Sequence, residues 1–387
     1  MHMDREFDLL DAPERLRTID LLLCVILAAI VLVARITERG ALYFVDGPRI
    51  VNAIQAGTYT IQSPGYWAFA HLGGLFADPA AGLQFWNILF STLGIPVFFL
   101  LCRLRRSNRV LCFATALAFG FTYFLWFAGE IHSAYASQIL FAPLAVLCAL
   151  HFRNKGQTHW LILWSLSAAV GFALRPSDGV FLMPLWLWLL PRTGRWPRAW
   201  LIFAGIQAVC FLCWDIPTQH ALHAVHLSGS GALILLSFRT SSPLLGLNAR
   251  RLANVARVII PTTLAFFPLL PAIASRRRPE DTRLAIIWLL PGLLFFLLCY
   301  IADPTYMIFL CPAWFWLAIT SENQRRTLVC MLICFAFNAT LFLAASPIRS
   351  DSTPARLVNF YAVKYCRYGV QHRWSSTLGD GAQLPPP

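Results

Sequence analysis

Residues 19–36 read IDLLLCVILAAIVLVARI, and residues 41–66, which follow after a short gap, read ALYFVDGPRIVNAIQAGTYTIQSPGY. The first stretch is an almost unbroken apolar run, long enough to cross a bilayer as a helix. The second is the longest polar-containing interruption before the next convincing apolar run. Together they predict a membrane anchor followed by a loop that holds chemically useful side chains at the membrane surface.

The loop itself has the signals of a short helix. Asp46-Gly47 suits a helix cap, Pro48 is tolerated in a first helical turn, and Gly57 suits a stop. Apolar and polar residues between these signals take opposite faces, Ile50, Val51 and Ile54 on one and Arg49, Asn52 and Gln55 on the other. This pattern predicts a helix lying in the membrane interface. The sequence Ser63-Pro64-Gly65-Tyr66 then breaks the chain.

Composition places the whole chain in the membrane class. Hydrophobic residues make up 58% and charged residues 13%, whereas about 25% of residues are charged in an ordinary soluble domain. The mean hydropathy is +0.62. A formal charge of +13 is compatible with nucleic-acid binding, but the arginines form short clusters between apolar runs, which is typical of orientation signals. We therefore exclude nucleic acid as a partner.

Apolar runs recur along the chain and predict eleven membrane spans. They cover residues 19–36, 83–102, 110–128, 134–151, 160–174, 180–190, 199–214, 252–274, 284–301, 306–320 and 328–345. Residues 160–174 and 180–190 are shorter than the ~20 residues that a crossing normally needs, so they form either two spans or a re-entrant pair. We expect an all-α polytopic membrane protein with interfacial helices in its first outer loop, residues 37–82.

Charge predicts the orientation, because cytoplasmic loops hold an excess of Arg and Lys. With the N-terminus inside, every inner loop is basic. These loops carry Arg103, Arg105, Arg106 and Arg109, then Arg153 and Lys155, then Arg192, Arg195 and Arg198, then Arg276, Arg277, Arg278 and Arg283, then Arg325 and Arg326. This predicts a cytoplasmic segment 1–18, a membrane domain 19–345 and an outer tail 346–387. The acidic flank before the first span argues against a cleaved signal peptide.

Two clusters of metal-binding residue types have ordinary alternatives. Ten of the eleven cysteines lie in or at the ends of apolar runs, where cysteine behaves as a small hydrophobe. His220, His223 and His226 recur at helical spacing, which suits either a ligand for metal or phosphate or packing at the interface. No metal site is assigned, and a cofactor requirement stays open.

Three segments on the predicted outer face have distinctive sequences. The first runs from Val45-Asp46-Gly47 through Ser63-Pro64-Gly65-Tyr66, with Glu130 opening a second outer loop; the second is Ala173-Leu174-Arg175-Pro176-Ser177-Asp178 and the third is Asp303-Pro304-Thr305-Tyr306. They resemble the first-loop pattern, an RPSD segment and a late D-P-x-Y segment of the GT-C superfamily of integral-membrane glycosyltransferases. Within it, the chain is most similar to bacterial protein O-mannosyltransferase-like and lipid A aminoarabinose transferase-like proteins.

The resemblance implies transfer of a sugar, with inversion, from a polyprenyl-phosphate carrier to an acceptor lipid, glycan or protein outside the cytoplasmic membrane. It departs from the pattern in two places. The Asp-Glu pair of many protein mannosyltransferases is Asp46-Gly47 here, and no large soluble domain follows the last span. Membrane lipid is the other expected partner.

The residues suit this chemistry. A carboxylate at a low-dielectric boundary can accept the proton of the acceptor hydroxyl, and Asp46 is the candidate base, with Glu130 as a second catalytic candidate. Cations offset the charge of the phosphate leaving group. Candidates for donor or acceptor binding are Arg49, Tyr66, His132, Arg175, Asp178, Arg239, Asp303 and Tyr306.

Each assignment has a structural alternative. Asp46 also suits a helix cap, Glu130 also suits the end of a span in water, and Arg175 with Asp178 also suits an ion pair at a helix junction. At the level of function, the alternatives are a membrane transporter and a non-catalytic subunit of cell-envelope polysaccharide assembly. A transporter needs polar groups through the middle of the bilayer, whereas the enzyme needs Asp46 and Glu130 at one outer cavity.

Overall fold

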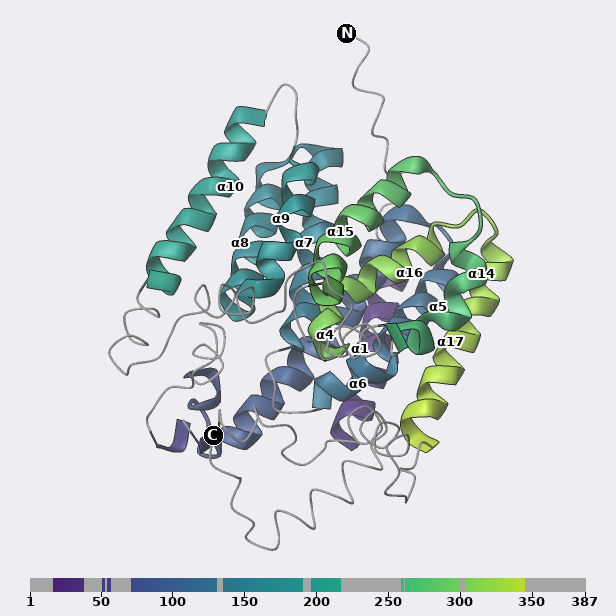
Figure 1. The fold of residues 1–387 in the computed structure, drawn as a ribbon, viewed down its shortest axis with the longest axis horizontal. Coiled ribbons are helices and arrows are strands. Elements are labelled where there is room, and N and C mark those ends of the chain that lie inside the picture. The colour runs from purple at the N-terminus through teal and green to yellow at the C-terminus, as the bar shows by residue number, and fades with distance from the viewer. Residues whose placement is uncertain are drawn as a thin grey trace, which may run out of the picture.

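The computed structural model describes residues 17–37, 51–52, 54–56, 71–130, 135–190, 196–216, 259–260, 262–298 and 304–344. Every regular element in these ranges is a helix, as Figure 1 shows. The elements are α1 (Thr18–Thr37), α4 (Pro79–Arg105), α5 (Arg109–Gly120), α6 (Tyr123–Glu130), α7 (Ser137–Lys155), α8 (Thr158–Leu174), α9 (Pro176–Leu189), α10 (Trp196–Cys210), the π-helix η1 (Phe211–Asp215), the 3-10 helix η2 (Phe267–Leu269), α14 (Leu270–Ile273), α15 (Pro279–Leu298), the 3-10 helix η3 (Pro304–Leu310), α16 (Cys311–Ile319) and α17 (Gln324–Ala344).

The predicted fold class is confirmed, since the chain is an all-α polytopic membrane protein. Each of the eleven predicted apolar runs contains helical residues in the structure. Within the described ranges, three helices are long and apolar enough to cross a membrane by length and composition, namely Thr18–Ile36, Pro79–Arg105 and Pro197–Trp214. The total of eleven spans therefore stays a prediction.

The predicted span over residues 110–128 is not one continuous helix, because the chain breaks between α5 and α6. Thr122 lies between the two helices and turns its hydroxyl back onto the carbonyl of Ala118, at 2.9 Å. The amide of Tyr123 donates instead to the Oδ1 atom of Asn338 on α17, at 3.2 Å. A side chain far along the chain thus satisfies a group that an unbroken helix would satisfy internally.

Helices α8 and α9 form a tight hairpin whose connection is shorter than predicted. The sequence predicts an outer connection over residues 175–179, but Arg175 alone separates the two helices. Pro176 suits the first helical turn and Asp178 is favoured there by the helix dipole, so α9 begins early. At the other end, Trp160 stacks on His151 of α7, with ring centroids 4.3 Å apart. Near the C-terminal end of α8, the carbonyl of Gly171 accepts from Gln138 of α7, so α8 packs along most of α7.

Two kinds of contact hold the helices of the core together: a close approach between helix backbones and the packing of aromatic rings. Gly94 of α4 lies against the backbone of Ile139 in α7, so a Cβ atom at this position would collide with the Ile139 carbonyl. Phe98, Phe119 and Phe315 bring α4, α5 and α16 together, with centroid distances of 4.4, 6.2 and 5.6 Å. All three rings are fully buried.

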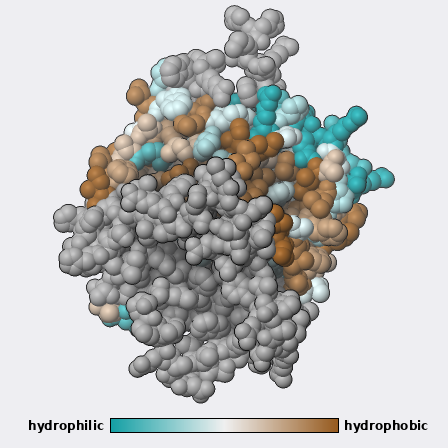
Figure 2. Space-filling view, in the orientation of Figure 1, coloured by the Kyte–Doolittle hydropathy of each residue, from teal (hydrophilic) through white to brown (hydrophobic). Residues whose placement is uncertain are grey.

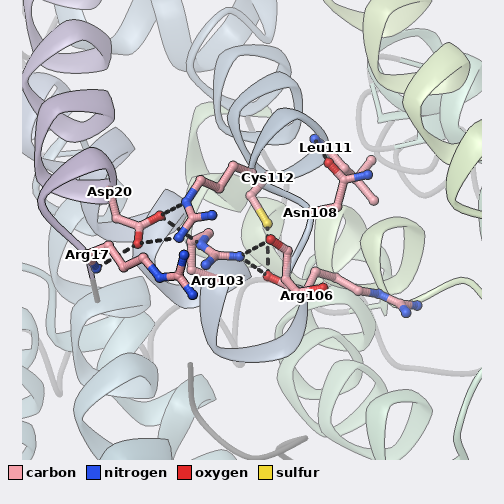
Figure 3. Close-up of polar contacts among 9 residues, drawn as sticks. Arg17, Asp20, Arg103, Arg106, Asn108, Leu111 and Cys112 are labelled. Carbon is pink, nitrogen blue, oxygen red and sulfur yellow. Dashed lines mark hydrogen bonds and ion pairs between the residues drawn. The ribbon is translucent and has the colours of Figure 1, made fainter. Parts of the chain in front are cut away.

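The described parts of the predicted inner loops meet at one end of the bundle, which is the upper end in Figure 1, where α10 and α15 begin. Figure 3 shows Asp20 of α1 held by arginines from α4 and α5. The Nε atoms of Arg103 and Arg109 lie 3.0 and 2.9 Å from its Oδ1 atom. Arg106 donates to the carbonyls of Ile319, the last residue of α16, and of Ser321, just after it. We call this the basic end.

The sides of the described bundle are apolar. Figure 2 shows hydrophobic side chains over much of the uncovered surface, while hydrophilic ones gather near its upper edge. Exposed apolar residues follow α1, α10 and η1, among them Val25, Val33, Leu201 and Leu212. Such a surface is expected of a helix bundle whose sides contact lipid tails.

Candidate active site

Four side chains from three segments meet at the end of the bundle opposite the basic end. Arg175 lies at the α8–α9 junction, Asp178 in the first turn of α9, Tyr135 just before α7 and Tyr306 in η3. The guanidinium carbon of Arg175 lies 4.3 Å from the centre of the Tyr135 ring and 5.8 Å from that of Tyr306. The two rings are 5.2 Å apart. We call these four residues the Arg175 cluster.

The ion pair in this cluster is long. Nε and Nη2 of Arg175 lie 3.4 Å from the two carboxylate oxygens of Asp178, and Ser177 donates its hydroxyl to Oδ1 of Asp178 at 3.1 Å. Charge-assisted hydrogen bonds between guanidinium and carboxylate are normally about 2.7–2.9 Å long. At the basic end, Arg105 reaches Asp281 at 2.7 Å. The contacts between Arg175 and Asp178 are therefore longer than those of an optimal bidentate guanidinium–carboxylate pair.

The Arg175–Asp178 pair is buried. The side chains of Arg175 and Asp178 are 8% and 3% exposed, so their charges lie in a medium of low dielectric constant. The tyrosine rings stabilise the cation through its face, and Asp178 accepts hydrogen bonds at the guanidinium edge. A guanidinium has the chemistry to bind a carboxylate, as it binds Asp178 here, or a phosphate.

Elements that carry other predicted site residues pack nearby. η3, which carries Tyr306, packs against α6, and Glu130 is the last residue of α6. In the first outer loop, Val51 and Ile54 pack into a small apolar cluster with Leu174, the residue before Arg175. These two positions of the predicted apolar face are therefore packed against the protein, in the same cluster as the residue that precedes Arg175. The placement of this helix in the membrane interface stays a prediction.

The structure therefore brings together three of the predicted site residues, Arg175, Asp178 and Tyr306. Glu130 is described through its backbone alone. The remaining predicted site residues are Asp46, Arg49, Tyr66, His132, Arg239 and Asp303, and they lie outside the described residues, as do His220, His223 and His226. The structural alternative for Arg175 and Asp178, an ion pair at a helix junction, is present as a contact.

Two residues of this end were not among the predicted site residues. Tyr135 lies 2% exposed against Arg175. Arg35, near the end of α1, is fully buried although it falls inside the first apolar run. The sequence did contain a signal for Arg35, because a charge inside a membrane helix is costly and is usually retained for a function.

The described residues contain no group of three or more His, Cys, Asp or Glu side chains that could hold a metal ion. The nine cysteines within these ranges are free thiols, and six of them are buried. This is the environment in which cysteine packs as a small hydrophobe.

Comparison with known proteins decides the fold. No family model matches the chain, and no curated protein matches its sequence. Among solved structures, the chain is similar to ArnT from Cupriavidus metallidurans bound to undecaprenyl phosphate, with a TM-score of 0.59 and 18% identity, over 90% of this chain and 69% of that one. The chain has the ArnT fold.

The apo state of ArnT from the same organism is similar to the same degree. Its TM-score is 0.57 at 18% identity, over 89% of this chain and 68% of ArnT. The fold implied by the resemblance to lipid A aminoarabinose transferase-like proteins is therefore confirmed. At this level of identity, the likeness to ArnT concerns the path of the chain.

Proposed function

We propose that this protein is a membrane glycosyltransferase that moves a sugar from a polyprenyl-phosphate carrier to an acceptor on the outer face of the cytoplasmic membrane. The observation that carries the proposal is the ArnT fold over 90% of the chain, since one of the ArnT structures holds undecaprenyl phosphate. The Arg175 cluster supports it, because a buried cation at a membrane interface suits a lipid phosphate.

The proposed reaction is an inverting displacement at the anomeric carbon of the sugar. The acceptor hydroxyl gives its proton to Asp46 while its oxygen forms the new glycosidic bond. The bond between the anomeric carbon and the phosphate oxygen breaks, and polyprenyl phosphate leaves with the electron pair. Arg175 offsets the charge that develops on the leaving phosphate. Glu130 binds or orients the acceptor.

The positions of buried charges favour an enzyme over a transporter. Transporters hold polar groups near the middle of the bilayer. Among the described residues, the buried Asp and Arg side chains lie in the first or last turns of helices or at a junction: Asp20, Arg35, Arg103, Arg105, Arg175, Asp178 and Asp281. These buried charges therefore lie at the two ends of the bundle rather than in its middle.

Deleting the gene tests the function directly. We expect one lipid-linked or surface glycan to lose the mass of a single sugar unit, and a polyprenyl-phosphate sugar to accumulate. Mass spectrometry of lipid and glycan extracts measures both, and re-expression of the parent chain should restore them. Unchanged glycans in the deletion strain, with transport of a solute impaired, would favour the transporter alternative.

The orientation is a prediction of its own. A single cysteine at Ser350, in a variant without other reactive thiols, should react with a membrane-impermeant maleimide in intact cells, because the five basic loops predict that the tail 346–387 lies outside. A cysteine at Ser107, beside the basic end, should react only after the membrane is permeabilised. The reverse pattern would place the Arg175 cluster on the cytoplasmic side and refute the proposed active face.

A second prediction separates binding from folding at Arg175. Replacing both partners, Arg175→Met with Asp178→Leu, removes the buried pair without leaving an isolated charge, which is often close to neutral for stability. We expect this double variant to fold and to transfer sugar about 10²- to 10³-fold more slowly, the usual cost of removing one electrostatic contact to a developing charge. Rates per folded molecule, with folding checked by thermal unfolding in detergent, measure the effect. Parental transfer by a stable double variant would leave Arg175 a purely structural residue.

A further inference from the structure

Arg35 lies near the end of α1 with its side chain fully buried. Its Nη2 atom donates to the carbonyl of Gly120, the last residue of α5, at 2.6 Å. Its guanidinium carbon lies 5.9 Å from the centre of the Phe121 ring and 5.6 Å from that of Trp126 in α6. One side chain of α1 therefore contacts both sides of the break between α5 and α6.

Asn338 of α17 contacts the same break. Its Oδ1 atom accepts from the amide of Tyr123, and its Nδ2 atom donates to the carbonyls of Ala265 and Cys334, each at 2.9 Å. Arg35 thus satisfies a carbonyl before the break, and Asn338 satisfies an amide after it. Two buried side chains from α1 and α17 determine the direction in which α6 leaves the break.

The C-terminal end of α6 also lies close to Arg35. A Cβ atom added to Gly129 would lie 2.7 Å from the Nε atom of Arg35 and 2.6 Å from the hydroxyl of Ser91 on α4. Arg35 and Ser91 are both fully buried, so their side chains have little room to rotate away. The residue after Gly129 is Glu130, and α6 packs against η3, which carries Tyr306 of the Arg175 cluster.

We propose that Arg35 is a positioning residue of this protein. It lies between the α5–α6 break and Gly129, and it determines the position of the last turn of α6, which carries Glu130. The inference rests on the proposed transferase function. A single carbonyl can be satisfied by a neutral side chain, whereas a planar guanidinium can bind the carbonyl and lie against two rings at once. Loss of Arg35 should therefore shift α6 without emptying the lipid-phosphate site.

The test compares two arginines that play the same local role at opposite ends of the bundle. Arg35→Met removes the contacts with the α5–α6 break and with Gly129. Arg106→Met removes the arginine that donates to the carbonyls of Ile319 and Ser321 at the basic end. Each variant is re-expressed in the deletion strain, where the initial rate of glycan modification is measured per folded molecule. Binding of undecaprenyl phosphate to the purified full-length protein is measured alongside it.

We expect Arg35→Met to lower the transfer rate about 10- to 100-fold, since a misplacement of about 1 Å can cost 10²-fold. Undecaprenyl phosphate should bind Arg35→Met with parental affinity, Arg35→Lys should regain part of the rate, and Arg106→Met should match the parent in both measurements. Gly129→Ala, which keeps Arg35 and disturbs the same contact sterically, should also lower the rate with binding intact.

Three outcomes would overturn the inference. They are a parental transfer rate in Arg35→Met, a rate that falls only in proportion to the folded fraction, and equal losses in Arg35→Met and Arg106→Met. If Arg35→Met does not fold, a parental rate in both Arg35→Lys and Gly129→Ala refutes it instead. Failure of the proposed function is recognised separately, because the parent chain would then leave the glycans of the deletion strain unchanged.

Discussion

Asp46→Asn is expected to lower the rate of sugar transfer by about 10²- to 10⁴-fold, the usual range for loss of general-base catalysis. The substitution keeps the size of the side chain but removes the basic carboxylate, so the acceptor hydroxyl no longer has a group that takes its proton. Folding and membrane insertion should be unchanged, because Asn caps a helix nearly as well as Asp. Glycan mass in the complemented deletion strain, at matched expression, measures the effect.

Glu130→Gln is the matched comparison for Asp46→Asn. If Glu130 orients the acceptor rather than taking its proton, the amide keeps part of that role, and the rate should fall less than in Asp46→Asn. Asp46→Ala is a poor substitute because it removes the cap along with the base. Full glycan modification by Asp46→Asn would refute the assignment of Asp46 as the base and favour the non-catalytic alternative.

Asp281→Asn should destabilise the bundle by about 3–5 kcal/mol, the usual cost of breaking a buried ion pair from one side. Arg105 donates to both carboxylate oxygens of Asp281, at 3.0 Å from Nε to each and 2.7 Å from Nη2 to Oδ2. Both residues are buried, so the variant leaves a guanidinium without its counter-charge. Thermal unfolding of the purified protein in detergent measures the loss.

The control for Asp281→Asn is the double variant Arg105→Met with Asp281→Leu. It replaces the pair by apolar side chains of similar volume, and its stability should lie close to that of the parent. Its transfer rate per folded molecule should also be parental, because the pair lies at the basic end, away from the Arg175 cluster. An Asp281→Asn variant as stable as the parent would mean that solvent or another group compensates Arg105 there.

Some helix ends follow from signals nearby in the sequence, and others depend on contacts with distant residues. Hydropathy predicts a span from residue 180, whereas α9 begins at Pro176, because Pro176 and Asp178 are local signals of a first helical turn that hydropathy does not include. Thr122 shows the opposite case. The residues around Thr122 are apolar, so hydropathy predicts one span. The helix nevertheless breaks there, and Asn338, 215 residues from Tyr123, accepts from the Tyr123 amide.

The same distinction between local signals and distant contacts applies to the candidate site. The spacing of Arg175 and Asp178 left open whether they bind a ligand or form an ion pair, and only the structure shows the contacts of 3.4 Å between them. The resemblance to glycosyltransferases singled out Tyr306, whereas its place beside Tyr135 depends on how η3 packs against α7. Arg35 was overlooked because its contacts are with α5 and α6 rather than with its own neighbours in sequence.

The sequence by itself determined the membrane class, the positions of most helices and the clustering of arginines between spans. These depend on hydropathy, on helix-end residues and on local charge, which act over a few residues. Only the tertiary structure decided the break between α5 and α6, the loose setting of Arg175 and the burial of Arg35 against Gly129. Each of these depends on which side chains from distant helices meet in a low-dielectric interior, and hydropathy along one segment does not contain that information.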